Sequence, residues 1–348
     1  MRIHIRAVLR RRSVLCTLAV ALAALLPVAA QLGSPTGAVA SGVELTPAVS
    51  RIAGADRYEE AVLISQRANP GGTDTVFLAS GASFADALSA VPVASVYGAS
   101  LLLTPSSGLI PSGVVSEIIR LRPGTVTAVG GPASVPDAAL EQVRAILPRT
   151  SVSRISGADR YAVSRAIAGT LLPSAPGAMI ATGRDFPDAL SAGAAAGASF
   201  VPLVLVDGAA PTPDTATLDL LSTYKLSGFA LIGGPASISA GVESAITGLA
   251  RPVRILGSDR YQVSIAVNDR LPGDFSTVYL ATGVTFPDAL AGGVLAGQHR
   301  SPLYVVPPDC VPKGVLAALS SHGTSRVILL GGVASLNDAV ASLTACSW

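Results

Sequence analysis

Charged and aromatic residues are scarce in this 348-residue sequence: 13% of the residues are charged and 4% are aromatic, whereas 50% are hydrophobic. A chain with so few charges and so many apolar residues does not belong to the disordered class. Its 35 glycines and 25 prolines are scattered rather than periodic, which excludes a collagen-like chain. The composition therefore predicts a folded protein that is long enough for roughly two or three hydrophobic cores.

An excess of positive charge is also absent once the amino terminus is set aside. The formal net charge is +2, but residues 1–40 hold five arginines and no acidic residue. From Ser41 onward, 19 basic residues stand against 22 acidic ones, which gives a net charge of −3. This balance lacks the basic footprint of a nucleic-acid-binding domain, so we expect no nucleic-acid partner.

The amino terminus has the layout of a secretory signal peptide. Its five arginines precede an apolar run over residues 14–30 that is interrupted by Pro27 and ends in small residues. An uncleaved membrane anchor is the alternative, but the run is shorter than the roughly 20 residues that a spanning helix needs. We expect residues 1–40 to be a signal peptide that is cleaved after Ala30 or Ala40, with export by the general or the twin-arginine route. The mature protein would then be secreted and would have no membrane span.

Cysteine and histidine are rare, which limits metal and catalytic chemistry. In the exported part only Cys310 and Cys346 remain, and an even count in an oxidising compartment predicts one disulfide, with two buried thiols as the alternative. Together with His322 they match no zinc-binding spacing. No histidine lies between His4 and His299, and no Gly-x-Ser-x-Gly motif occurs. We expect no catalytic residue, no metal and no cofactor.

Three short motifs recur in the same order three times. They are Arg-Ile-x-Gly-x-Asp-Arg-Tyr from Arg51, Arg154 and Arg254, Phe-x-Asp-Ala-Leu from Phe84, Phe186 and Phe286, and Gly-Gly-x-Ala-Ser from Gly130, Gly233 and Gly331. The first motif returns after 103 and then 100 residues, a period longer than that of solenoid repeats. We therefore expect three small domains, at residues 51–149, 154–250 and 254–348.

Short apolar runs alternate with helical patterns in each copy. In the first copy, strands are expected at 75–80, 100–104 and 125–130, and helices at 84–97, 111–121 and 136–147. The runs show no polar alternation, which is typical of parallel strands that are buried on both faces. The pattern predicts an α/β fold made of three similar small parallel-sheet sandwiches.

The second helix of the repeat is rich in small residues in copies two and three, at 193–197 and 292–297. Small residues let helices approach closely, so these helices pack either against those of the other copies or on their own sheet. The linkers between copies, about six residues long, are too short for independent tumbling. We therefore expect the copies to pack around a pseudo-threefold axis with their second helices in contact.

The first motif places an aspartate and then an arginine at the start of a helical pattern. Asp56, Asp159 and Asp259 are expected to be N-cap residues. An arginine in the first turn opposes the helix dipole at a cost of about 0.3–1 kcal/mol, so it needs another explanation. Arg57, Arg160 and Arg260 either pair with a carboxylate from elsewhere in the fold or present their guanidinium groups to an anionic ligand.

The second and third motifs allow a catalytic or a structural interpretation. Asp86, Asp188 and Asp288 could be acids or metal ligands of an enzyme. Ser83, Asp185 and Thr285 precede them by three residues, however, so each stretch also has the pattern of an N-cap and an N3 carboxylate, which we favour. These aspartates are also possible partners of the motif arginines. The Gly-Gly-x-Ala-Ser motif lacks the features of a P-loop or a dinucleotide fold and is expected to be a tight strand-to-helix turn.

Together the three motifs resemble the cell wall binding repeat 2 family of bacterial surface proteins, over residues 51–348. Copy one departs from the pattern at Ala85 and copy three at Val333. The resemblance implies three tandem copies of a Toprim-like, Rossmann-like α/β fold in a pseudo-threefold arrangement. It also implies non-covalent attachment to an anionic glycopolymer of the Gram-positive wall, a teichoic-acid-like polymer or polysaccharide.

The motifs and the resemblance lead to one functional hypothesis and one alternative. We expect a secreted, wall-associated, non-catalytic protein in which Arg57, Arg160 and Arg260 contact the polymer. The alternative is an exported hydrolase that acts on the wall and uses the motif aspartates as acid and base.

Overall fold

The computed structural model describes residues 46–224 and 226–348. The predicted signal peptide at residues 1–40, with both possible cleavage sites, lies outside the described residues. Within the described ranges, no helix combines the length and the hydrophobicity that crossing a membrane requires.

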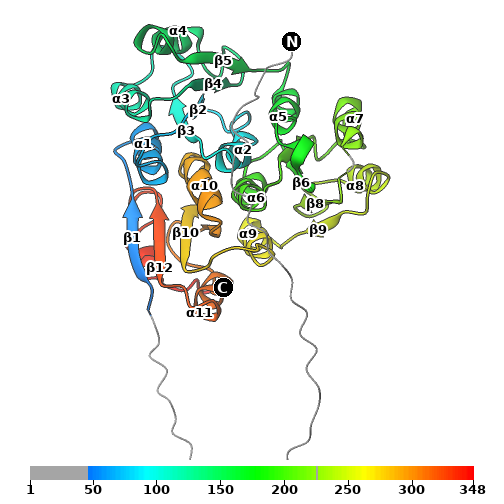
Figure 1. The fold of residues 1–348 in the computed structure, drawn as a ribbon. Coiled ribbons are helices and arrows are strands. Elements are labelled where there is room, and N and C mark those ends of the chain that lie inside the picture. The colour runs from blue at the N-terminus through cyan, green and yellow to red at the C-terminus, as the bar shows by residue number, and fades with distance from the viewer. Residues whose placement is uncertain (1–45, 225) are drawn as a thin grey trace, which may run out of the picture. The chain divides into compact units, whose positions relative to one another are not determined.

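Parallel β-sheets form the framework of the structure. The strands of the described residues are β1 (Ala48–Ile52), β2 (Thr75–Ser80), β3 (Ser100–Thr104), β4 (Thr125–Val129), β5 (Ser151–Ile155), β6 (Gly177–Thr182), β7 (Leu203–Val206), β8 (Gly228–Ile232), β9 (Val253–Ile255), β10 (Thr277–Thr282), β11 (Leu303–Val306) and β12 (Arg326–Leu330). They form three four-stranded sheets with the orders β3-β2-β4-β5, β7-β6-β8-β9 and β11-β10-β12-β1 (Figure 1). Every strand pair is parallel, which confirms the predicted fold class.

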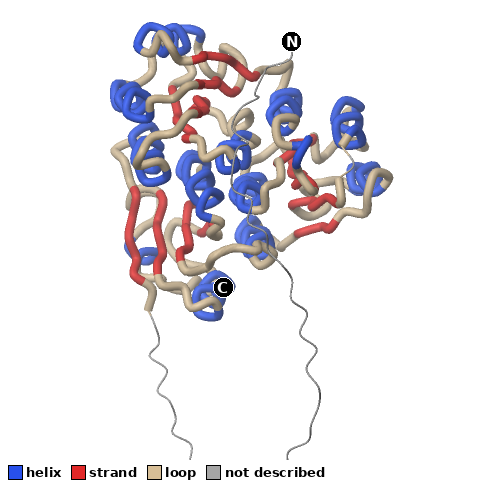
Figure 2. The backbone as a smooth tube through the Cα atoms, in the orientation of Figure 1, coloured by secondary structure: helices blue, strands red, loops and turns tan. Residues whose placement is uncertain are grey.

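Helices connect the strands and cover the sheets (Figure 2). The helices are α1 (Arg57–Ala68), α2 (Ala90–Val96), α3 (Ser112–Leu121), α4 (Asp137–Ile146), α5 (Arg160–Ala168), the 3₁₀ turn η1 (Leu172–Ser174), α6 (Pro187–Ala198), α7 (Thr215–Thr223), α8 (Ala240–Thr247), α9 (Arg260–Asn268), α10 (Pro287–His299), α11 (Lys313–Ser321) and α12 (Asp338–Ala341). In the first unit, α3 and α4 pack on one face of the sheet, whereas α1 and α2 belong to a core shared by all three copies.

The second helix of copy one is shorter than predicted. The sequence predicts a helix over 84–97, but α2 begins only at Ala90. Its counterparts α6 and α10 begin with Pro187 and Pro287 at their first position. Proline there has a backbone angle already suited to a helix, whereas copy one has Ala85 at the same place. The absence of this proline accounts for the later start.

The strand of the first motif completes the sheet of the preceding copy. By sequence β5 and β9 open copies two and three, but they pair with β4 and β8 of the copy before. The strand β1, which opens copy one, pairs with β12 of copy three, from Ala48 opposite Arg326 to Ile52 opposite Leu330. The three units are therefore linked in a closed ring, in which the N-terminal strand completes the last sheet.

The helices α2, α6 and α10 contact one another pairwise at the centre of the shared core. Every residue of α6 is buried, which is possible because the helix consists almost entirely of small and apolar side chains. A Cβ atom on Gly197 would lie 2.7 Å from Cβ of Ser95, and one on Gly293 would lie 3.0 Å from Val91. The glycines thus allow the helices of different copies to approach closely. The predicted pseudo-threefold packing of the second helices is confirmed.

Candidate functional site

The arginine that opens the first motif binds the glycine turn of the preceding copy. In each copy its Nη1 atom donates a hydrogen bond to the carbonyl oxygen of the first glycine of the third motif. The pairs are Arg51 with Gly331 (2.6 Å), Arg154 with Gly130 (2.7 Å) and Arg254 with Gly233 (2.8 Å). No role for these arginines was predicted from the sequence, although their recurrence at one place in three copies is a signal of one.

The same glycine turn receives the aspartate of the second motif. Gly130, Gly233 and Gly331 have φ angles of 101°, 115° and 104°, in the region that favours glycine. A Cβ atom on any of them would overlap Oδ2 of an aspartate. The overlapping carboxylates are, in the same order, those of Asp86, Asp188 and Asp288. Glycine is therefore required both for its conformation and for its small size.

The serine of the third motif contacts the same carboxylate. The Ser134 hydroxyl donates a hydrogen bond of 2.6 Å to Oδ2 of Asp86. Ser237 and Ser335 lie at the equivalent places beside Asp188 and Asp288. The three motifs, far apart in the sequence, thus form one cluster that is repeated three times at the carboxyl ends of the strands.

The predicted N-caps in front of the second motif are wrong. In α6 and α10 the N-cap positions belong to Phe186 and Phe286, and no side chain caps these helices. Asp185 instead accepts a hydrogen bond from the backbone N–H of the next residue. In copy one α2 starts well after Ser83. Pro187 and Pro287 occupy the first position of α6 and α10, so the phenylalanine before each proline is the N-cap residue.

Asp188 and Asp288 are buried, with exposed fractions of 8% and 7%. Burial raises the pKa of both carboxyls above its usual range, and the neighbouring Ser237 or Ser335 hydroxyl opposes this rise. The environment that raises the pKa of these carboxyls is therefore formed by the chain's own residues. Among the described residues, no group of three or more histidine, cysteine, aspartate or glutamate side chains could hold a metal ion.

The aspartates of the first motif are the N-cap residues of α1, α5 and α9. Oδ1 of Asp56 accepts hydrogen bonds from the backbone N–H groups of Tyr58 (2.8 Å) and Glu59 (2.9 Å). Asp159 and Asp259 accept equivalent bonds at 2.8–2.9 Å. These bonds satisfy N–H groups that have no partner within the helix, and they fix where each helix begins.

Three phenylalanine rings, one from each copy, meet at one point. The ring centroids of Phe84, Phe186 and Phe286 are 5.5, 5.8 and 6.0 Å apart, and two of the three pairs are edge-to-face. Such spacings are those of attractive aromatic pairs. Because each ring belongs to the same motif in a different copy, the cluster marks the pseudo-threefold axis. The sequence did not predict this meeting.

Arg57, Arg160 and Arg260 occupy equivalent positions, one in each copy. Nη1 of each donates a hydrogen bond to the carbonyl oxygen of the glycine that follows the second strand of its copy. The acceptors are Gly81, Gly183 (2.7 Å) and Gly283 (2.6 Å). The Arg160 guanidinium lies 5.6 Å from the centre of the Phe84 ring, and that of Arg260 lies 5.9 Å from Phe186. These two arginines thus reach the phenylalanine of the preceding copy.

None of the three arginines forms an ion pair with a carboxylate among the described residues, where the ion pairs involve other arginines. The charges of Arg57 and Arg260 nevertheless act on Asp288 and Asp188, and partly offset the rise in the pKa of these carboxyls. Arg57 is exposed, and Arg160 and Arg260 are half-buried. Within residues 46–224 and 226–348 each guanidinium has a single carbonyl partner, so its other N–H groups can contact a ligand.

The geometry of this site suits an anion. Ligands of open parallel α/β sheets bind at the carboxyl ends of the strands, which is where the three motifs meet. Guanidinium groups bind phosphate and carboxylate through paired, charge-assisted hydrogen bonds. The fold and the motif cluster define a three-unit α/β repeat protein with three equivalent arginines around a shared axis.

The chain belongs to the family described as Cell wall binding domain 2 (CWB2). The family model matches residues 51–140, 154–243 and 254–341, which is one match for each copy. The resemblance predicted from the three motifs is therefore confirmed, and the chain is a cell wall binding protein by family.

Two curated proteins of Bacillus subtilis (strain 168) are similar in sequence. N-acetylmuramoyl-L-alanine amidase LytC is 28% identical over 294 residues, which cover 84% of this chain and 57% of LytC. The protein named Amidase enhancer is 30% identical over 310 residues, which cover 88% of this chain and 41% of that protein. The chain thus spans about half of the length of these relatives.

Two solved structures from Clostridium difficile have a similar fold. Cwp6 superposes with a TM-score of 0.78 at 28% sequence identity, over 86% of this chain and 48% of Cwp6. Cwp8 gives a TM-score of 0.76 at 22% identity, over 85% of this chain and 51% of Cwp8. The likeness to Cwp8 concerns the fold alone.

Proposed function

We propose that this is a secreted, non-catalytic protein that attaches non-covalently to an anionic glycopolymer of the Gram-positive cell wall. The observation that carries the proposal is the recurrence of Arg57, Arg160 and Arg260 at equivalent positions of three copies that meet at the phenylalanine cluster, with Arg160 and Arg260 beside its rings. Membership in a wall-binding family supports the wall as the partner.

Three arginines at equivalent positions suit a polymer better than a small anion. A linear polyanion can occupy several weak sites at once, so that its total affinity exceeds that of any single contact. The net charge of −3 does not oppose this, because the local field at the site decides the binding of an anion. The Debye screening length falls to about 3 Å in 1 M salt, so wall binding is expected to weaken as salt is added.

A wall hydrolase that uses the motif aspartates has less support. The carboxylates of Asp188 and Asp288 are buried between a glycine turn and a serine hydroxyl. A general acid or base must come within hydrogen-bond reach of the substrate atom that it serves. Carboxylates enclosed by their own fold are better suited to holding the glycine turn.

Sedimentation with purified walls tests the proposal. The triple variant Arg57→Lys, Arg160→Lys and Arg260→Lys keeps the charge but loses the two-pronged hydrogen bonding of guanidinium. We expect it to keep its melting temperature and to lose most of its wall binding. A matched control replaces three exposed arginines outside the site, Arg122, Arg144 and Arg270, with lysine and is expected to bind as the parent does.

Walls stripped of their secondary polymer complete the experiment. The parent protein is expected to sediment with intact walls and to stay in solution with stripped ones. A folded triple variant that sediments as well as the parent would exclude these arginines from the site. Release of soluble wall fragments by the parent protein would instead identify a hydrolase.

A further inference from the structure

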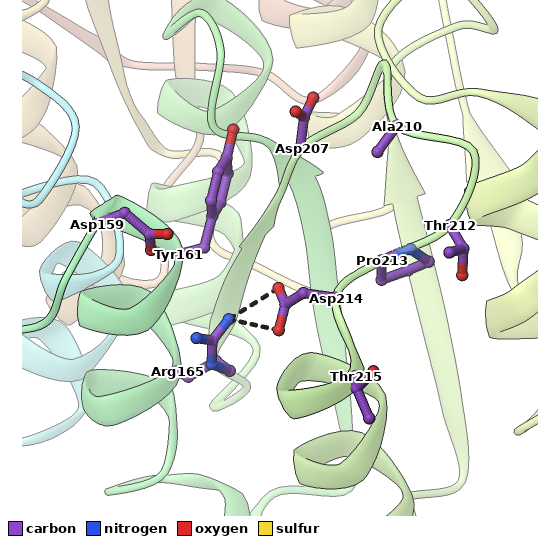
Figure 3. Close-up of a pocket in the computed structure, with 9 residues that line it drawn as sticks. All are labelled: Asp159, Tyr161, Arg165, Asp207, Ala210, Thr212, Pro213, Asp214 and Thr215. Carbon is purple, nitrogen blue, oxygen red and sulfur yellow. Dashed lines mark hydrogen bonds and ion pairs between the residues drawn. The ribbon is translucent and has the colours of Figure 1, made fainter.

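Copy two contains a surface cavity of about 410 Å³ (Figure 3). Tyr161 and Arg165 reach it from α5, and Asp207 and Asp214 reach it from the loop between β7 and α7. Pro213 lies on the same loop. The volume is within the range of about 300–1,000 Å³ that is typical of small-molecule sites.

Two ion pairs shape this cavity. Nη1 of Arg165 donates to both carboxylate oxygens of Asp214 at 2.8 Å, as the dashed lines in Figure 3 show. At the other end, Nη1 of Arg184 lies 3.0 Å from Oδ1 of Asp207. The Asp207 and Asp214 side chains remain 39% and 44% exposed. Both oxygens of Asp214 also accept hydrogen bonds from Thr217 at the start of α7. Within the described residues, by contrast, Oδ2 of Asp207 has only a 3.4 Å contact with Arg184 and is accessible to a ligand.

The other two copies provide an internal comparison. At the equivalent positions they have apolar residues in place of all four charged ones. The replacements are Val62 and Ile265 for Arg165, Ala82 and Val284 for Arg184, Pro105 and Pro307 for Asp207, and Pro111 and Pro312 for Asp214. The fold thus forms without these charges, and partly exposed ion pairs contribute little to stability. Four concerted differences around one cavity therefore indicate a role in binding.

The tyrosine of this cavity offers an open ring. In copy three the equivalent Tyr261 has the ring of Trp348 at a centroid distance of 6.1 Å and an angle of 33°. Tyr161 has no aromatic neighbour of this kind within the described part of the chain. In copy three the chain's own Trp348 thus covers Tyr261. In copy two the ring of Tyr161 is available to the ring of a ligand.

The groups that line the cavity select the chemistry of its occupant. Three carboxylates, of Asp159, Asp207 and Asp214, stand against the guanidinium groups of Arg165 and of the adjacent Arg184, which leaves one net negative charge and disfavours anions. Carboxylate oxygens accept hydrogen bonds from hydroxyl and ammonium groups. The tyrosine ring and Pro213 add apolar surface. A ring that is apolar on its face and carries hydrogen-bond donors on its rim fits this combination.

We propose that the cavity of copy two binds a sugar ring that is neutral or carries an amino group. Tyr161 stacks against the face of the sugar, and Asp207 accepts hydrogen bonds from its hydroxyl or ammonium groups. Arg165 holds Asp214 in place and donates to a ring or hydroxyl oxygen. As part of a wall glycopolymer this ligand rests on the proposed function, but the binding of free sugars can be tested without it.

Saturation-transfer NMR on the full exported chain, with free glucose, glucosamine and glucuronate as probes, tests the proposal. We expect transfer to glucose or glucosamine and none to the anionic glucuronate. The decisive variant gives copy two the residues of copy one: Arg165→Val, Arg184→Ala, Asp207→Pro and Asp214→Pro. It is expected to fold, since copy one folds with these residues, and to weaken sugar binding by about tenfold or more. The milder pair Asp207→Asn and Asp214→Asn keeps the helix cap of α7 and is expected to have the same effect.

The control removes an exposed ion pair in copy one, through Glu141→Ala and Arg144→Ala, and should leave sugar binding unchanged. Absence of transfer from the parent to all three sugars, or equal transfer to glucuronate, would overturn the proposal. So would sugar binding by the folded variants that matches the parent. The lysine variants at Arg57, Arg160 and Arg260 should still bind free sugar, so failure of the wall-polymer site and failure of this cavity give different results.

Discussion

Glu60 is a buried acid at a position where the other two copies have valine. Its exposed fraction is 4%, and its counterparts are Val163 and Val263. Within the described residues its Oε1 atom is buried without a hydrogen-bond partner. Burial, and next the negative charge of Asp288, raise the pKa of Glu60 to about 8, although Arg51 opposes the rise. The contact between copies one and three therefore contains a group that titrates near neutral pH.

This shift predicts that stability falls as pH rises from about 4.5 to 8. In that interval the unfolded chain has lost the Glu60 proton, because the usual pKa is 4.5, whereas the folded chain still holds it. The corresponding loss is on the order of 4 kcal/mol. The variant Glu60→Val, which copies the other two repeats, is expected to be more stable than the parent at pH 8. Urea unfolding at several pH values between 5 and 8 measures both effects.

Two further variants isolate the role of the Glu60 charge. Glu60→Gln should remove the pH dependence without changing the size of the side chain. Glu141→Gln, at an exposed position, should leave the dependence as it is in the parent. A difference in stability between parent and Glu60→Gln that stays constant from pH 5 to 8 would show that Glu60 does not titrate as described.

The strand β1 holds the ring closed through its backbone and through Arg51. Nη1 and Nη2 of Arg51 donate to the carbonyl oxygens of Gly331 (2.6 Å) and Leu336 (2.8 Å) of copy three. Hydrogen bonds of a charged group contribute about 1.5–3 kcal/mol each when partly buried. We expect Arg51→Ala to lower the free energy of unfolding by about 2–4 kcal/mol, measured by urea titration. Arg57→Ala, which removes an arginine of the proposed polymer site, should cost much less, and equal losses for the two variants would contradict these separate roles.

Local sequence patterns predicted the helices and strands whose positions depend on their own residues rather than on distant contacts. The apolar runs located β2 and β3, and the small residues of α6 and α10 indicated contact between copies. The strand β1 was missed because Ala48–Ile52 is short and half-exposed and shows no apolar run. Its structure comes from pairing with β12, almost the whole chain away.

The sequence predicted which residues belong to the candidate site but not which of them contact one another. The recurrence of the motifs singled out Arg57, Arg160 and Arg260 and the motif aspartates. The meeting of Phe84, Phe186 and Phe286 could not be predicted, because it depends on how three copies pack. The hydrogen bond from the arginine that opens each first motif to a glycine of the preceding copy could not be predicted for the same reason.

The three copies depend on one another for their cores. Every residue of α6 is buried, in a core to which all three copies contribute, and the sheet of copy two needs β9 from copy three. A fragment of residues 154–250 is therefore expected to lack a cooperative unfolding transition, because it exposes an apolar helix and a bare strand edge. Circular dichroism during heating measures this. A fragment that melts cooperatively near the temperature of the full chain would show that the copy is independent.

Cys310 and Cys346 form a disulfide that joins the segment before α11 to the C-terminal segment. The bridged residues are 36 positions apart. In the loop-entropy model this cross-link stabilises the fold by about 3–4 kcal/mol. We expect the double variant Cys310→Ser and Cys346→Ser to lose stability by that amount in chemical denaturation. Titration of the denatured, exported parent protein should find no free thiol, and two free thiols would exclude the bond.

The pairing of β1 with β12 has a mechanical consequence. The two strands are parallel, with five residue pairs between Ala48 and Ile52 on one side and Arg326 and Leu330 on the other. Tension between residue 46 and the C-terminus pulls β1 toward its starting end, and the Cys310–Cys346 disulfide passes the pull at the other terminus to the finishing end of β11, on the far side of the same parallel sheet. The force then acts along the strands, so their hydrogen bonds share the load and must break together rather than in sequence. A protein held on a wall by its three copies would in this way resist stretching at the point where the ring is closed.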